Sequence, residues 1–132
     1  SNLQVGVGKE PEDCFSLPKK SVDYGKNIAA YYFWLFPNIM FNFYPWGLSI
    51  NIVTPIGPEK TKVKFLSYIW DNSKLDAGAG AELDKVEKED EEIVEQVQKG
   101  VKSKFYDRGH FSPSMEQGVH HFHLLLSQFI KM

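Results

Sequence analysis

Four stretches in the first half of the chain are dense in apolar residues and predict β-strands. Each is rich in β-branched and aromatic side chains, which favour a pleated, half-buried surface. They are IAAYYFWLF (28–36), IMFNFY (39–44), LSINIVT (48–54) and TKVKFLSYIW (61–70), separated by turns that contain Pro or Gly. Because these connections are short, neighbouring strands should pair antiparallel, so residues 28–70 are predicted to form a β-meander.

Alternation within the strands predicts two different faces for this sheet, since every second side chain points to the same side. One face should be core, and we expect on it Ile39, Phe41, Phe43, Leu48, Ile50, Ile52, Val63, Phe65 and Ile69. The other face mixes polar and aromatic residues, and we expect on it Tyr31, Met40, Asn42, Tyr44, Tyr68 and Trp70. Such a face is too apolar for plain solvent, so something should cover it or bind there.

The spacing of apolar residues lengthens after Asp71, which predicts helices. Positions three and four apart should form one apolar stripe made of Leu83, Val86, Asp90, Ile93, Val97 and Val101, with a single acid in it. A second helix is expected to start with Ser112 as N-cap and Pro113 at its first position. Strands over 28–70 followed by a helical segment over 75–131 indicate an α+β domain, with helices packed on one face of an antiparallel sheet.

Composition and charge narrow the class of protein. A chain of 132 residues with 42% hydrophobic content can form one domain with a core, so we interpret 1–132 as a single domain. Residues 1–27 should be irregular or weakly paired at a sheet edge. The net charge of -2 gives no reason to expect nucleic acid or a membrane as partner. The single Cys14 and the absence of a signal-peptide pattern favour a cytoplasmic location.

The histidines lie in the last quarter of the chain, yet their arrangement does not favour a metal site. They are His110, His120, His121 and His123. Two of them, at i and i+3, could share a metal, but the last three point in different directions and Glu116 is the one carboxylate among them. Gly78 and Gly80 lack the other residues of a phosphate-binding turn, so they predict a flexible loop that enters the helix.

The acidic segment KEDEEIVEQVQKG, residues 88–100, poses the main chemical question. Most of its acids should form a solvated helix surface that neighbouring lysines offset. Asp90 differs because it falls between Val86 and Ile93 in the apolar stripe, and a carboxylate directed at a core must be paired, protonated or bound to a cation. A surface residue at the rim of the core is the alternative interpretation.

Two longer strings resemble a known family. They are YYFWLFPNIMFNFYPWGLSINIVTPIGPEKTKVKF and EDEEIVEQVQKGVKSKFYDRGHFSPSMEQGVHHFHLLL. Both are similar to the C-terminal part of the catalytic domain of Rieske-type aromatic-ring-hydroxylating oxygenase alpha subunits, and most of all to the branch that contains choline monooxygenase and carnitine oxygenase. The resemblance implies a partial helix-grip domain, related to the Bet v 1 and START folds. The GVHHFH string belongs to the family pattern without binding iron.

The resemblance also implies cofactors, partners and site residues. Complete family members hold a Rieske 2Fe–2S cluster in an N-terminal segment and a mononuclear Fe(II) bound by two histidines and one carboxylate. Asp90 matches that carboxylate, with Glu89 as the alternative, and Tyr31, Met40, Asn42 and Tyr44 become candidates for the wall of a substrate pocket. A reductase would deliver electrons from NAD(P)H, O2 and a small organic substrate would react, and a homo-oligomer, a trimer in the family, is implied.

The chain departs from the family pattern in the ligands that it lacks. No histidine precedes His110, so the two iron-binding histidines and the Rieske ligands are absent. We therefore expect this chain to be inactive by itself, either as an excised C-terminal part or with a companion chain that supplies the rest. Two other interpretations are a stand-alone helix-grip module that binds a small molecule without iron chemistry, and a subunit that only supports assembly.

Overall fold

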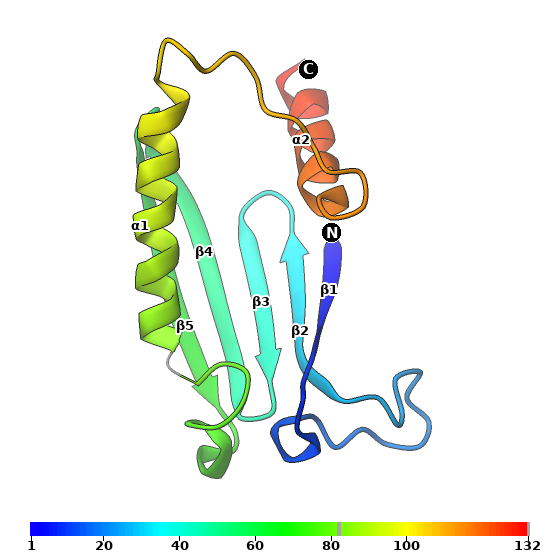
Figure 1. The fold of residues 1–132 in the computed structure, drawn as a ribbon. Coiled ribbons are helices and arrows are strands. Elements are labelled where there is room, and N and C mark those ends of the chain that lie inside the picture. Colours follow the sequence, from blue (N-terminus) through cyan, green and yellow to red (C-terminus); the bar gives the residue numbers. More distant parts are fainter. Residues whose placement is uncertain (82, 132) are drawn as a thin grey trace. The chain divides into compact units, whose positions relative to one another are not determined.

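The computed structural model describes residues 1–81 and 83–131, without the side chain at position 84. Five antiparallel strands form one sheet in the order β1-β2-β3-β4-β5 (Figure 1). Their bounds are Asn2–Val7 for β1, Ile28–Leu35 for β2, Ile39–Tyr44 for β3, Gly47–Gly57 for β4 and Lys60–Ile69 for β5. The predicted meander is therefore confirmed, because each strand pairs with the next one along the chain.

The first strand is more regular than the sequence suggested for residues 1–27. β1 pairs with β2 from Asn2 to Val7, with a register shift after Gly6. It occupies one edge of the sheet, which agrees with the prediction that residues 1–27 could pair weakly at a sheet edge. An irregular segment follows from Gly8. Backbone pairing explains the difference, because a strand can form on a neighbour's free hydrogen-bonding groups without an apolar period of its own.

The strand register assigns the side chains to two faces, which we call the apolar face and the mixed face. Directly paired residues share a face, so Ile39 lies beside Ile52 and Phe41 beside Ile50. The apolar face carries Leu3, Val5, Tyr31, Phe33, Leu35, Ile39, Phe41, Phe43, Leu48, Ile50, Ile52, Leu66 and Tyr68. The mixed face carries Ala30, Tyr32, Trp34, Met40, Asn42, Tyr44, Ser49, Asn51, Val53, Val63 and Phe65.

One strand was assigned to the wrong face from its sequence. Val63, Phe65 and Ile69 were expected beside Leu48 and Ile50, but β5 pairs Leu66 with Ile50, which puts its odd-numbered residues on the mixed face. The same pairing places Tyr68 opposite Leu48, on the apolar face. A one-residue change of register moves a whole strand to the other face, and the turn between β4 and β5 sets that register.

The core also lies on the opposite side from the one predicted. Ala30, Tyr44 and Trp46 are buried and form one cluster, with Leu75, Ala79 and Leu83 packed against it. The two strand residues of this cluster belong to the mixed face, so the expectation that something covers this face is confirmed. The apolar face remains partly open, since Phe33 is 39% and Leu35 49% exposed. The reason is that the connection after β5 folds onto the mixed face.

Two helices follow the sheet, as the α+β class requires. α1 spans Leu83–Val101 and α2 spans Gln117–Ile130. The chain forms two compact units, Ser1–Glu91 and a second one that begins at Glu92, so the first part of α1 belongs to the unit with the sheet. Within the described ranges, neither helix combines the length and the apolar content that a membrane crossing needs.

The second helix begins later than predicted. Gln117 is its first residue, and residues 113–115 form a turn. Ser112 is therefore not its N-cap, although its backbone N–H donates to Oε2 of Glu116 at 2.7 Å. Glu116 itself occupies the cap position. The side chain of Glu116 thus closes the preceding turn and delays the start of the helix.

Self-association of the isolated chain is the first testable prediction. The apolar face exposes Leu3, Phe33, Leu35 and Tyr68, and contiguous apolar surface of this kind drives association in water. We expect light scattering to report species larger than one chain, and Phe33→Glu to shift them towards the monomer. Val22→Glu is the control, because Val22 is 92% exposed in a loop. A wild-type chain that stays monomeric over a wide concentration range would contradict the prediction.

Candidate functional site

The orientation of α1 distinguishes the two acids proposed as metal ligands. Leu83, the first residue of the helix, packs against the cluster on the mixed face. Asp90 follows seven residues later, about two turns, so it lies within about 20° of the same side of the helix. Glu89 lies about 120° away from Leu83 around the axis. Of the two acids, only Asp90 is therefore on the side of α1 that begins against the mixed face.

The apolar stripe around Asp90 is not buried as predicted. Val86 is 48%, Ile93 56% and Val97 57% exposed, and Asp90 itself is exposed. The physical reason is that the described core reaches α1 only at its first turn, through Leu83. Burial therefore does not force Asp90 to bind a cation in this chain, which corrects the prediction, and only the direction of Asp90 on α1 supports it as a ligand.

Three of the four candidate pocket residues share the mixed face. Met40 pairs with Asn51, Asn42 pairs with Ser49, and Tyr44 ends the same strand. The hydroxyl of Ser49, which is buried, donates to Oδ1 of Asn51 at 3.1 Å. This side of the sheet therefore offers amide and hydroxyl groups among aromatic rings, a combination that is typical of small-molecule sites.

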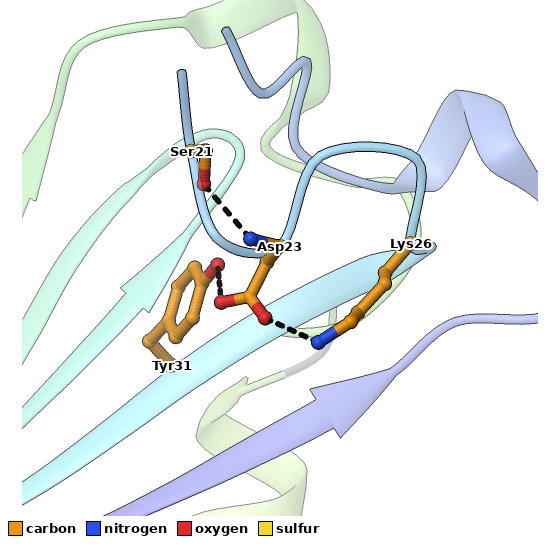
Figure 2. Close-up of polar contacts among 4 residues, drawn as sticks. All are labelled: Ser21, Asp23, Lys26 and Tyr31. Carbon is orange, nitrogen blue, oxygen red and sulfur yellow. Dashed lines mark hydrogen bonds and ion pairs between the residues drawn. The ribbon is translucent and has the colours of Figure 1, made fainter. Parts of the chain in front are cut away.

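Tyr31, the fourth candidate, lies on the other face. It pairs with Phe43, so its expected place beside Met40 and Asn42 is wrong. Its hydroxyl donates to Oδ2 of Asp23 at 3.0 Å, and Lys26 donates to Oδ1 of the same carboxylate at 2.7 Å (Figure 2). Its ring also contacts Phe15 at a centroid distance of 5.5 Å. Tyr31 thus attaches the loop before β2 to the sheet.

The charges in this loop support the same structural role. The bonds from Lys26 and Tyr31 lower the pKa of Asp23, while partial burial and the bond to Asp23 raise the pKa of Tyr31. Both shifts favour a charged carboxylate beside a neutral phenol. The backbone N–H of Asp23 also donates to the hydroxyl of Ser21, as Figure 2 shows, so the loop is held from within.

Tyr44 is the most electrostatically perturbed residue on the mixed face. Burial raises the pKa of its hydroxyl far above the ordinary value of 10.0, and Tyr32 and the charge of Glu87 add to the rise. Glu87 lies about one turn before Asp90 on α1, within about 60° of it around the helix axis. Sequence reasoning missed Tyr32 and Glu87, because helix and strand residues can be matched only when the packing direction of the helix is known.

The pKa of Tyr44 gives a prediction for alkaline pH. The unfolded chain releases the phenol proton near pH 10, whereas the folded chain holds it, so the stabilising contribution is complete below about pH 10 and is lost as pH rises further. We expect the free energy of unfolding to fall between about pH 10 and 11.5 more steeply in the wild type than in Tyr44→Phe. Urea titrations at several pH values measure this difference, and equal slopes for the two chains would contradict it.

Two histidines of the second unit pack against an aromatic ring. Phe111 contacts the rings of His120 and His123 at centroid distances of 5.2 and 5.3 Å. Across the described ranges, no three His, Cys, Asp or Glu side chains come together in a way that could hold a metal ion. Among the residues that the structure describes, Asp90 is therefore one donor without companions, and these residues do not by themselves fit a mononuclear iron.

Comparison with known proteins gives the class and then the family. The family described as "Ring hydroxylating alpha subunit (catalytic domain)" matches residues 18–131. Choline monooxygenase, chloroplastic, of Arabidopsis thaliana is 40% identical over 109 residues, which are 78% of this chain and 25% of that protein. The carnitine monooxygenase oxygenase subunit of Escherichia coli (strain K12) is 30% identical over 98% of this chain and 36% of that subunit. No solved structure matches the chain.

An α+β domain with an acidic helix after a β-meander, matched over most of its length by one family, defines the class of this protein as an alpha-subunit catalytic domain. The chain belongs to the family of ring-hydroxylating alpha-subunit catalytic domains. It spans a quarter to about a third of the length of the curated relatives named above, at 25% and 36%.

Proposed function

We propose that this chain is the C-terminal part of the catalytic domain of a Rieske non-haem iron oxygenase. Beyond membership of the family, one observation supports this proposal: Asp90 lies on the same side of α1 as Leu83, which packs against the cluster on the mixed face. In the complete protein, Asp90 would supply the carboxylate of an Fe(II) site, and segments outside this chain would supply the two histidines. A reductase and a 2Fe–2S cluster would deliver electrons to this site. The bound iron would supply the O2 chemistry by which a small organic substrate is hydroxylated or demethylated.

The substrate class that we propose is a quaternary ammonium compound rather than an aromatic ring. The relatives are named for choline and carnitine, which both carry a trimethylammonium group. Such a cation binds favourably over the faces of aromatic rings, and the mixed face carries Tyr32 and Trp34. Met40 and Asn42 would line the same pocket. The expected homo-oligomer and the cytoplasmic location are parts of this proposal.

Iron content tests the proposal directly. The chain alone should purify without stoichiometric iron, because one carboxylate cannot hold Fe(II) against water. A longer polypeptide that includes the upstream histidines should bind about one Fe(II) per mononuclear site. The proposal fails if the longer polypeptide binds no iron there, and a stand-alone binding module would then be favoured if it still bound choline or carnitine. Tight binding of one iron by the isolated chain would contradict the proposed division of ligands.

A further inference from the structure

A row of polar side chains crosses the mixed face from one edge of the sheet to the other. The strand register pairs each member with the next, so all of them lie on this face. They are Gln4 in β1, Tyr32 in β2, Asn42 in β3, Ser49 in β4 and Ser67 in β5. Since neighbouring strands lie about 4.8 Å apart, the row presents a hydroxyl or an amide group at each such step.

The next row along the same strands is more apolar. Its members are again paired one after another, and they are Asn2, Trp34, Met40, Asn51 and Phe65. Asn51 is partly buried and places an amide group between Met40 and Phe65. In the regular stretches of the register, no residue on the mixed face is charged. A small molecule on these strands would thus meet aromatic and aliphatic surface with an amide in it.

Ser49 holds the side chain of Asn51 in one orientation. The hydroxyl of Ser49, which is 1% exposed, donates to Oδ1 of Asn51 at 3.1 Å. This bond occupies the amide oxygen, so the Nδ2 group of Asn51 keeps its two N–H donors for another partner. A donor that is already fixed in place loses little conformational freedom when a ligand binds.

We propose that Asn51 is a specificity-determining residue that donates a hydrogen bond to a neutral oxygen of the substrate, and that Ser49 is its positioning residue. The neutral oxygen belongs to a hydroxyl rather than to a carboxylate, because a carboxylate would leave water for strands that offer no cationic partner. The trimethylammonium end lies over aromatic rings of the same face. This inference rests on the substrate class proposed above, but it does not require the iron.

Two probes that differ by one hydroxyl group test the inference in the complete protein, prepared without iron. Choline carries the hydroxyl, and ethyltrimethylammonium is the same cation without it. Calorimetric titration should show choline bound about 2- to 10-fold more tightly, the range expected for one neutral hydrogen bond. If both probes bind equally, only this inference is overturned. If neither binds, the proposed substrate class fails with it.

A third probe tests the choice of a neutral oxygen. Glycine betaine carries a carboxylate in place of the hydroxyl of choline. It should bind more weakly than choline, because nothing on the mixed face repays the loss of its hydration. Tighter binding of glycine betaine than of choline would overturn the assignment of a neutral oxygen to this site.

Matched variants test the two residues. Ser49→Ala and Ser67→Ala each remove one hydroxyl from the same row, but Ser49 is buried and bonded to Asn51, whereas Ser67 is exposed on the edge strand β5. Asn51→Leu should abolish the preference for choline over ethyltrimethylammonium, Ser49→Ala should reduce it, and Ser67→Ala should leave it unchanged. A merely structural role would weaken both probes alike and keep the preference, which would overturn the inference. The wild-type comparison of probes still decides if a variant fails to fold.

Discussion

Asp90→Ala in the complete protein should weaken Fe(II) binding more than any other single change in this chain. The substitution removes the one anionic ligand that we propose for the iron. Since changes that merely disturb a metal ligand cost about 10- to 100-fold in affinity, loss of the ligand should cost on the order of 100-fold or more. Turnover should fall in parallel. Competition with a chelator measures the affinity, and the absorbance of the proposed 2Fe–2S cluster, which would lie outside this chain, should be unchanged.

Glu89→Ala is the control for Asp90→Ala, because the two acids are neighbours of equal charge and both are exposed. Glu89 points about 120° away from the side of α1 that carries Leu83, so its loss should leave Fe(II) affinity within about twofold of wild type. The reverse result, iron lost with Glu89→Ala and kept with Asp90→Ala, would show that the wrong acid was named. If neither variant changes Fe(II) affinity, α1 does not carry the iron ligand.

The isolated chain should respond differently to Asp90→Ala. Asp90 is exposed there, and exposed substitutions usually change stability by less than about 0.5 kcal/mol. Alanine is also the better helix former. The melting temperature should therefore stay the same or rise slightly. A clear fall would mean that Asp90 has a structural partner in this chain.

Sequence periodicity predicted the elements of this fold better than their packing. The four strands β2 to β5 and both helices were predicted, because residue type and turn residues act locally. The faces of β5 could not be predicted, since Val63 and Phe65 alternate equally well in either register and only the turn after β4 decides between them. The open apolar face shows the same limit, because alternation identifies two faces without showing which of them the connection after β5 will cover.

The candidate site shows where local patterns stop being informative. Asp90 is notable in the sequence because it interrupts an apolar stripe. That stripe is not buried, since Val86 and Ile93 are exposed, so the expected burial of Asp90 is wrong. What supports Asp90 is the contact of Leu83 with the aromatic cluster, a long-range packing fact. Gly80 was interpreted as a flexible loop residue, although its left-handed backbone sits on Trp46 and Tyr44. The sequence shows the Gly-x-Gly spacing, but it does not show that the aromatic rings of Trp46 and Tyr44 lie next to Gly80.

Trp46→Ala should destabilise the unit Ser1–Glu91 more than any other substitution in it. Trp46 is 1% exposed and stacked on Tyr44, and its Nε1 has no hydrogen-bond partner, so its contribution is packing alone. Removing a buried tryptophan side chain costs about 3–5 kcal/mol, a large share of the roughly 5–15 kcal/mol that stabilises a typical domain. Urea unfolding followed by far-UV circular dichroism measures the loss.

Trp70→Ala is the matched control for Trp46→Ala. Trp70 is 56% exposed and donates to the oxygen of Pro45 at 2.9 Å, so its removal should cost about 0.5–1.5 kcal/mol. If Trp46→Ala costs no more than Trp70→Ala, the cluster under α1 is not the core of this unit.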